Sequence, residues 1–192
     1  MGRTALFGGT FDPIHNAHLA IARAAVERFG LDKVVFVPAA NPPHKAAGAE
    51  APYDDRVRMV ELACEGERAF EVSRIEEGAP RSYSILTIEK MRAAGARRLS
   101  FLIGADAFAE IGAWHRWRDV VAAVDFIVVT RPGASYQIPE GAVVQELDGI
   151  ELPVSSSEIR TRLGKGDFTV PVPAAVLSYI REHQLYGSQA VR

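Results

Sequence analysis

The stretch GGTFDPIHNAH, residues 8–18, decides how the rest of this sequence is interpreted. It follows the short apolar run Thr4–Phe7, which is typical of a buried strand, and it leads into the segment NAHLAIARAAVERF. In that segment apolar residues recur at spacings of three and four, and Gly30 follows as a common C-terminal stop of a helix. Residues 8–18 are therefore predicted to join the first strand to the first helix.

Short apolar runs and helical patterns alternate along most of the chain. The apolar runs begin roughly 25 to 35 residues apart, which is the length of one βα unit. The predicted strands are Thr4–Phe7, Val34–Val37, Phe70–Val72, Leu99–Ile103, Phe126–Thr130 and Val143–Leu147. The predicted helices lie within residues 16–29, 54–66, 82–95, 117–124, 154–166 and 173–186. This alternation predicts an α/β protein whose parallel sheet is covered by helices on both faces.

A chain of 192 residues is expected to form one domain. We expect a core of about residues 1–150 and a small C-terminal helical subdomain of about residues 151–192. Residues 39–52, AANPPHKAAGAEAP, are rich in proline, alanine and glycine and are long for a plain connection. They are predicted to form a binding loop.

Composition excludes several classes of protein. Hydrophobic residues make up 48% of the chain and charged residues 24%, which is typical of a soluble globular protein. The formal net charge of −2 argues against a dedicated nucleic-acid binder. No apolar run is long enough for a signal peptide or a membrane span, so we expect a cytoplasmic protein with no membrane partner. The single cysteine, Cys64, lies in an apolar helical context and is predicted to be a small core residue.

Four residues of the 8–18 stretch indicate phosphate binding. Gly8 and Gly9 allow backbone amides to approach a ligand closely at the carboxyl end of a strand, where α/β sheets bind ligands. The following helix begins with unpaired N–H groups and a positive dipole end. His15 and His18 are three residues apart and share one face of that helix end. Two imidazoles there suit a polyphosphate whose oxygens gain charge during transfer.

Other interpretations of the same residues stay open at this point. Two helical histidines are often surface or packing residues, and a Gly-Gly pair is sometimes only a tight turn. His15 and His18 could also bind a metal with a third ligand such as His44. The sequence contains neither a GxxxxGK[ST] phosphate loop nor a GxGxxG dinucleotide motif, so a redox cofactor is not expected.

The stretch GGTFDPIHNAH resembles the HxGH signature of nucleotidylyltransferases, with Ala17 in place of its glycine. VSSSEIR, residues 154–160, resembles the second phosphate motif of that superfamily. Further stretches are placed as in bacterial nicotinate mononucleotide adenylyltransferases, and these are PPHK (42–45), SYS (82–84), IGADAF (103–108), the region of Trp114 and RPG (131–133). The resemblance covers residues 4–186 and implies a Rossmann-like, doubly wound parallel sheet.

The resemblance also implies one reaction. The 5′-phosphate of nicotinate mononucleotide attacks the α-phosphorus of ATP, pyrophosphate leaves, and nicotinate adenine dinucleotide forms. No enzyme nucleophile is needed, and the sequence contains no GxSxG elbow. Catalysis would come from positioning and charge stabilisation. Mg²⁺ is expected to be carried by ATP, with no metal site made by the protein alone.

Each residue that matches the family is expected to take the corresponding role. The expected ATP-binding residues are Gly8, Gly9, Thr10, Phe11, His15, His18, Gly104, Asp106, Ser155, Ser156 and Arg160. The expected mononucleotide-binding residues are Lys45, Ser84, Trp114, His115 and Arg131. Those expected to act during transfer are His15, His18, Lys45 and Arg160.

Some of these residues also have purely structural interpretations. Lys45 could be a solvated loop lysine, and Trp114 could serve only in packing. Ser155 could be a helix cap paired with Glu158, and Asp106 could cap the helix that follows it.

The sequence departs from the family pattern at three positions. Ala17 adds a methyl group near the expected path of the adenosine. Leu86 stands where the family usually has a polar residue, and Ser84 replaces a threonine. None of these changes removes a charged phosphate ligand.

Two rival functions remain. One is another adenylyltransferase of the superfamily, with nicotinamide mononucleotide or phosphopantetheine as the acceptor. The other is a non-catalytic nucleotide-binding module on the same scaffold. The helix faces and the C-terminal subdomain could also support a homodimer.

Overall fold

A computed structural model describes residues 2–42, 48–131, 133–150 and 153–188 of the chain. Its centre is a sheet of six strands, and every neighbouring pair runs parallel. The strands are β1 (Arg3–Gly9), β2 (Lys33–Pro38), β3 (Phe70–Val72), β4 (Arg98–Gly104), β5 (Asp125–Val129) and β6 (Val144–Leu147). The predicted parallel α/β sheet is thus confirmed.

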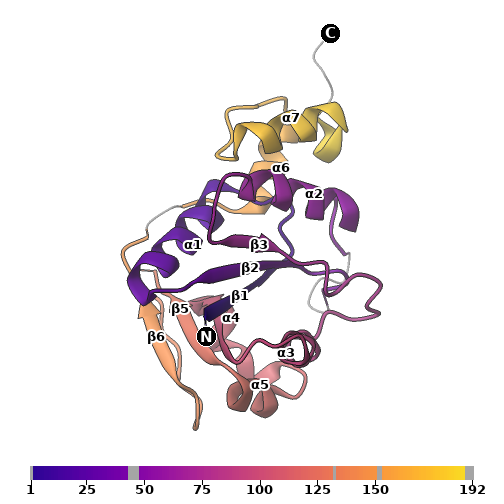
Figure 1. The fold of residues 1–192 in the computed structure, drawn as a ribbon. Helices are drawn as coiled ribbons and strands as arrows, with labels where there is room; N and C mark the ends of the chain where they lie inside the picture. Colours follow the sequence, from indigo (N-terminus) through magenta and orange to yellow (C-terminus); the bar gives the residue numbers. More distant parts are fainter. Residues whose placement is uncertain (1, 43–47, 132, 151–152, 189–192) are drawn as a thin grey trace.

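Helices cover both faces of this sheet (Figure 1). Those that pack on one face are α1 (Asn16–Phe29), α2 (Tyr53–Cys64), α6 (Ser156–Gly164) and α7 (Ala174–Glu182). Those on the other face are α3 (Ser84–Ala93), α4 (Ala105–Ala109) and α5 (Trp117–Ala123). Two short 3₁₀ turns, η1 (Ile111–Ala113) and η2 (Leu185–Gly187), complete the described elements.

The period of two along each strand divides the core into two layers. In β1, Ala5 and Phe7 face the layer under α1 and α2, whereas Leu6 faces the layer under α3 and α5. The other central strands alternate in the same way, which explains why they appear in the sequence as continuous apolar runs. Buried Cys64 belongs to the first layer, and burial raises the pKa of its thiol to about 12, so it is a core residue as predicted.

The strand order is β3-β2-β1-β4-β5-β6. The chain therefore winds outward from β1 in one direction and then from β4 in the other, as in Rossmann-like folds. The order reverses between β1 and β4, and the carboxyl ends of these strands diverge there into a crevice that is the usual ligand position. Gly8 and Gly9 end β1, and Gly104 ends β4, so the sequence places glycines at both sides of this switch point.

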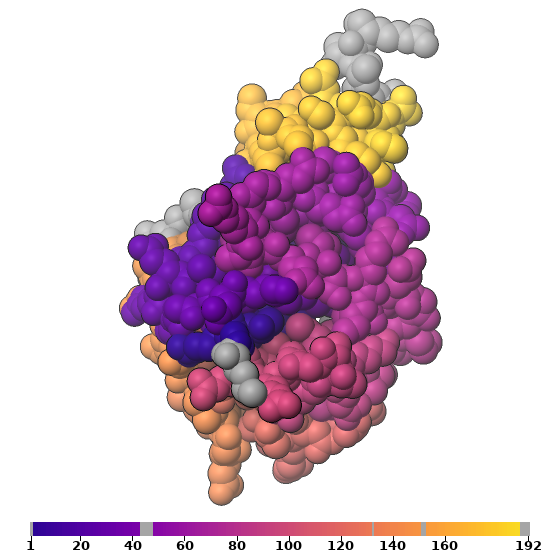
Figure 2. Space-filling model, in the orientation of Figure 1, coloured from indigo at the N-terminus to yellow at the C-terminus, as the bar shows by residue number. Residues whose placement is uncertain are grey.

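The C-terminal helices lie against α2 and the first core layer (Figure 2). Val176 and Ile180 of α7 are buried in the same cluster as Ala5 of β1. The Tyr179 hydroxyl donates to Asp55 Oδ1 of α2 at 2.7 Å. The expected division of one domain near residue 150 stays a prediction. Within the described ranges, no helix is both long and apolar enough to cross a membrane.

Candidate active site

Three adjoining cavities lie at the carboxyl ends of β1, β4 and β5. The histidine cavity, of about 320 Å³, is lined by His15, His18, Gly104, Asp106, Arg131, Ser155 and Ser156, among others. The tryptophan cavity, of about 630 Å³, is lined by residues that include Thr10, Ser84, Trp114 and His115. A central cavity of about 210 Å³ shares Gly104 with the first and Gly9 and Trp114 with the second. The shared residues place the three cavities side by side at the switch point, and we call them together the cleft.

His15 and His18 form a stacked pair at the start of α1. Their ring centroids are 3.7 Å apart, and the ring planes differ by 23°. His15 is the N-cap residue with extended backbone, and its backbone N–H donates to His18 Nδ1 at 3.2 Å. That bond fixes the neutral His18 as the tautomer with hydrogen on Nε2, so Nε2–H is the donor left for a ligand. The expected shared face is therefore present.

Both imidazoles are neutral at neutral pH. Burial lowers the pKa of His15 to about 4. Burial also lowers the pKa of His18 well below its usual value, and the neighbouring His15 lowers it further. His15 Nδ1 is buried without a hydrogen-bond partner among the described residues. Such an orphaned atom is rare in a folded protein, and it belongs to a residue that lines the histidine cavity.

A tight turn carries the chain from β1 to this pair. Phe11 has a positive φ of 48° and is 2% exposed, and its ring meets His18 edge-on with centroids 5.1 Å apart. Phe11 therefore supports the histidine from behind, and it is absent from the described residues that line the three cavities. The left-handed turn directs the Phe11 ring into the core, and the expected contact of Phe11 with the nucleotide stays a prediction.

Gly9 is required by that same turn. A Cβ atom on Gly9 would lie 2.9 Å from Phe11 Cζ, whereas a Cβ on Gly8 would meet only Phe101 at 3.7 Å. We expect Gly9→Ala to lower the free energy of unfolding by about 1–3 kcal/mol, because the packed Phe11 ring has to move. Gly8→Ala is the matched control and should stay within about 0.5 kcal/mol. Urea unfolding of the two variants measures the difference, and equal stabilities would contradict the packing argument.

The N-terminus of α6 faces the histidine cavity from the opposite wall. Ser155 is its N-cap, and Ser155 Oγ accepts a hydrogen bond from the Glu158 backbone N–H at 3.2 Å. Ser156 Oγ donates to the Pro13 carbonyl at 2.9 Å, which ties α6 to the turn before His15. The cavity thus lies between two helix N-termini, and their dipoles favour an anion between them.

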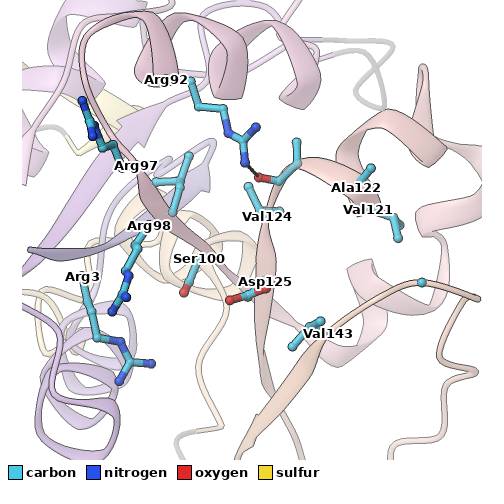
Figure 3. Close-up of a pocket in the computed structure, with 13 residues that line it drawn as sticks. Arg3, Arg92, Arg97, Arg98, Ser100, Val121, Ala122, Val124, Asp125 and Val143 are labelled. Atoms are coloured by element: carbon cyan, nitrogen blue, oxygen red, sulfur yellow. Dashed lines mark hydrogen bonds between the residues drawn. The ribbon is translucent and has the colours of Figure 1, made fainter. Parts of the chain in front are cut away.

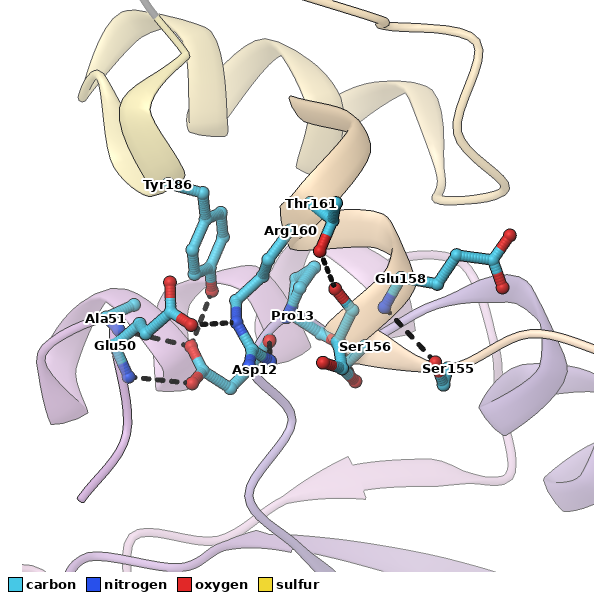
Figure 4. Close-up of polar contacts among 11 residues, drawn as sticks. Asp12, Pro13, Glu50, Ala51, Ser155, Ser156, Glu158, Arg160, Thr161 and Tyr186 are labelled. Atoms are coloured by element: carbon cyan, nitrogen blue, oxygen red, sulfur yellow. Dashed lines mark hydrogen bonds and ion pairs between the residues drawn. The ribbon is translucent and has the colours of Figure 1, made fainter. Parts of the chain in front are cut away.

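Arg160 does not line the histidine cavity. Its guanidinium donates to the Asp12 carbonyl at 2.9 Å and pairs with Glu50 at 2.6 Å (Figure 4). Asp12 is itself 1% exposed, and its carboxylate accepts from the Glu50 and Ala51 backbone amides and from the Tyr186 hydroxyl. Arg160 is therefore brought to the turn before the histidines, but it holds that turn from outside the cavity.

Arg56 is a buried arginine that hydrogen-bonds three backbone carbonyls, and the sequence analysis did not identify it. It is 2% exposed, and its guanidinium donates to the carbonyls of Thr10 at 2.7 Å, Ala39 at 2.8 Å and Ala51 at 3.1 Å. Burial lowers its pKa despite the nearby Asp12 carboxylate. In the sequence, Arg56 is in helical phase with Val60, a spacing that could have indicated a buried position. Its contacts join the ends of β1 and β2 and the start of α2.

The other end of the cleft has an aromatic wall. Trp114 is partly buried and meets Phe101 edge-on, with ring centroids 5.8 Å apart. His115 stacks on Tyr83 at 4.3 Å, directly beside the first residue of α3, Ser84. The N-terminus of this ten-residue helix therefore lies at the same cavity as a flat indole ring. A planar ring with a negative substituent fits such a wall.

Glu76 is a second residue that the sequence did not indicate. It is 7% exposed and borders the central cavity. Its carboxylate accepts from the Thr87 hydroxyl at 2.5 Å and from the Ala40 backbone N–H at 3.3 Å. Because these donors come from α3 and from the segment after β2, Glu76 fixes the two sides of the cleft relative to each other.

The remaining predicted residues differ in where they lie. Gly104, Asp106 and Arg131 line the histidine cavity, whereas we expected Arg131 beside the mononucleotide. The N-cap of α4 is Gly104, so the alternative that Asp106 caps this helix is wrong. Thr10 lines the tryptophan cavity, and its carbonyl is bound by Arg56. Lys45 lies outside the described residues.

Comparison with known proteins shows the family of this chain. A family model described as cytidylyltransferase-like matches residues 6–162. A protein of Solibacter usitatus named as a probable nicotinate-nucleotide adenylyltransferase is 60% identical over 187 residues, 96% of this chain and 100% of the relative. A protein of Pelobacter propionicus with the same name is 41% identical over 209 residues, 95% of this chain and 97% of the relative.

A solved structure shows the same fold. The Plasmodium falciparum nicotinic acid mononucleotide adenylyltransferase complexed with NaAD superposes with a TM-score of 0.80 at 18% identity, covering 98% of this chain and 99% of that one. The family model spans most of the chain, and the curated relatives cover nearly all of it. The chain therefore belongs to the cytidylyltransferase-like family and, within it, to the nicotinate-nucleotide adenylyltransferases.

Proposed function

We propose that this chain transfers the adenylyl group of ATP to nicotinate mononucleotide and releases pyrophosphate. The product is nicotinate adenine dinucleotide, so the reaction belongs to the biosynthesis of NAD. The observation that carries the proposal is the stacked, neutral pair His15 and His18 in a cavity between two helix N-termini. That cavity continues into an aromatic pocket of the size needed for a second substrate.

The histidine cavity is the proposed site of the ATP phosphates. His18 Nε2–H, the His15 imidazole and the hydroxyls of Ser155 and Ser156 are its proposed donors to phosphate oxygens. Ser156 would exchange its bond to the Pro13 carbonyl for one to phosphate. Gly8, Gly9 and Gly104 have no side chains, so the nucleotide can lie close to the backbone at the carboxyl ends of β1 and β4. Asp106 is proposed to accept a hydrogen bond from a ribose hydroxyl.

Arg131 and Arg160 are proposed as the cationic part of the phosphate site. Arg131 is exposed at the rim of the histidine cavity and can reach an entering triphosphate directly. Arg160 does not line the cavity, because Glu50 and the Asp12 carbonyl hold its guanidinium outside it. Exchange of Glu50 for phosphate would bring Arg160 into the expected contact. Lys45 is proposed as a further phosphate ligand on the family resemblance alone.

The aromatic pocket is the proposed site of nicotinate mononucleotide. Trp114 offers a flat surface to the pyridine ring. The N-terminus of α3 at Ser84 and the backbone at His115 would face the nicotinate carboxylate, where a helix dipole favours negative charge. Recognition by backbone amides also explains why Ser84 can replace the threonine of the family pattern.

The transfer needs no covalent bond to the protein. An oxygen of the mononucleotide 5′-phosphate forms a bond to the α-phosphorus of ATP, and the bond between that phosphorus and the bridging oxygen breaks. The electron pair of the broken bond leaves with pyrophosphate. The cleft aligns the two substrates, and neutral imidazole donors and helix ends stabilise the charge that develops on the phosphate oxygens.

A divalent cation, Mg²⁺ by our proposal, would shield charge on the triphosphate. Among the described residues that line the histidine cavity, Asp106 is the one acidic side chain, which suits a cation held mainly by the phosphates of the nucleotide. Asp106 is the carboxylate that borders the histidine cavity and could contribute one oxygen. Phosphate oxygens and water would supply the other ligands.

The choice of acceptor tests this function most directly. We expect kcat/KM for nicotinate mononucleotide to exceed that for nicotinamide mononucleotide by about 100-fold or more, because the amide cannot provide the charge that the end of α3 favours. A coupled assay of pyrophosphate release with each acceptor measures this ratio, and phosphopantetheine serves as the third acceptor. Equal use of acid and amide would contradict the proposed specificity.

A further inference from the structure

A further cavity, which has several charged side chains in its lining, lies at the amino ends of the strands, opposite the catalytic cleft. Its volume is about 460 Å³, which is within the range of small-molecule sites. Four arginines line it, namely Arg3, Arg92, Arg97 and Arg98, against a single carboxylate from Asp125 (Figure 3). The whole chain has a formal net charge of −2, so this concentration of positive charge is local.

These guanidinium groups are not neutralised within the described part of the chain. Seven other arginines form ion pairs with carboxylates, and these are Arg23, Arg28, Arg58, Arg74, Arg116, Arg160 and Arg162. None of the four cavity arginines has such a pair there. Arg92 donates to the Ala123 carbonyl, and the Asp32 carboxylate accepts from the backbone N–H of Arg3 rather than from its guanidinium.

Two of the arginines are direct neighbours across the sheet. Arg3 opens β1 and Arg98 opens β4, and the two are partners in the parallel register. Like charges at such positions repel each other and destabilise the pair of strands. An anion that lies between the two guanidinium groups attracts both and offsets their mutual repulsion. The planar guanidinium group also suits bidentate contact with phosphate.

The cavity has a second wall of different chemistry. Val121, Val124 and Val143 also line the cavity, together with Ala122 of α5, and Val124 lies beside Arg92 (Figure 3). Val143 is 56% exposed, whereas Val121 and Val124 are each 6% exposed and belong to the core, so the apolar surface that the fold leaves uncovered here is that of Val143. A ligand that matches both walls has a charged end and a mainly apolar or planar end.

We propose that this cavity binds a nucleotide with two or more phosphates, outside the catalytic cleft. The phosphates lie between Arg3 and Arg98, and the base or ribose lies on the valine wall. The site is separate from the catalytic cleft because β1, with seven residues, places roughly 20 Å between its amino and carboxyl ends. A nucleotide could therefore occupy both places in one chain.

Residue-resolved NMR titration of the full ¹⁵N-labelled chain with ADP tests the proposal. The amides of Leu99, Ala122 and Val124 report on the arginine cavity, and those of Gly9 and His18 report on the catalytic cleft. We expect saturable shifts in the first group with a midpoint of its own. In the double variant Arg3→Gln, Arg98→Gln, that midpoint should rise at least tenfold, while the shifts of Gly9 and His18 keep their wild-type midpoint.

The double variant Arg58→Gln, Arg68→Gln removes the same charge from exposed positions elsewhere and should leave both midpoints unchanged. Shifts that never saturate, or that are equally strong in both double variants, would overturn the site. A parallel titration with inorganic pyrophosphate separates a nucleotide from a bare anion. We expect ADP to bind several times more tightly, and equal affinities would overturn the role of the valine wall.

Discussion

His18→Ala is expected to lower kcat for pyrophosphate release by about 10²–10³-fold, the usual loss when one preorganised donor to a developing oxyanion is removed. The loss corresponds to about 2.7–4 kcal/mol of transition-state stabilisation. The reason is that Nε2–H of His18 is held toward the cavity by the bond that Nδ1 accepts from the His15 backbone. Steady-state kinetics with ATP and nicotinate mononucleotide measure the change.

Two controls separate this effect from a loss of structure. Asn16→Ala changes the exposed first residue of the same helix and should keep kcat within about twofold of wild type, in line with a surface change near zero in energy. Urea unfolding of His18→Ala shows how much stability the capping contact contributes. Near-normal pyrophosphate release by His18→Ala would support the rival interpretation, a non-catalytic nucleotide-binding module.

Arg56→Met is expected to have the largest effect on stability, a loss of about 3–5 kcal/mol of unfolding free energy. Methionine fills much of the space but leaves the carbonyls of Thr10, Ala39 and Ala51 without their donors in a buried environment. Because Thr10 and Ala39 follow β1 and β2 at the cleft, we also expect kcat to fall in the fraction of the protein that stays folded.

Arg58→Met is the matched control for this prediction. Arg58 lies two residues later in α2, its side chain is 47% exposed, and it pairs with Glu61 on the surface. Exposed pairs of this kind contribute little, so its loss should cost no more than about 0.5–1 kcal/mol. Urea unfolding of both variants gives the comparison, and equal losses would show that the three buried contacts of Arg56 do not stabilise the fold.

Periodicity explains why much of the fold could be predicted. The strand cores at Val34–Val37 and Leu99–Ile103 were evident because both faces of a parallel strand are buried, so that all their residues except Ser100 are apolar. Short α4 was not predicted as an element of its own, because five residues carry no helical period. The edges of the predicted helices differ from those observed by a few residues, since capping and packing decide where a helix ends.

The candidate site was predictable in part. Glycines, histidines and serines next to predicted strand and helix ends indicated the phosphate cavity, and the structure brings His15, His18, Ser155 and Ser156 to one cavity. Arg160 was also near the expected place, but its guanidinium is held by Glu50, a contact across 110 residues of sequence. Such long-range pairing leaves no local pattern.

The sequence by itself determined the alternation of strands and helices, the two glycines at the end of the first strand and the two imidazoles at a helix start. These features follow from local spacing and from the limited set of conformations that each residue type allows. Only the tertiary structure decided that Phe11 turns inward beneath His18, that Arg56 is buried among three carbonyls and that four arginines share one cavity. Those outcomes depend on which distant segments of the chain pack against each other. The burial of apolar surface drives this packing, and because it is non-directional it leaves no local pattern in the sequence.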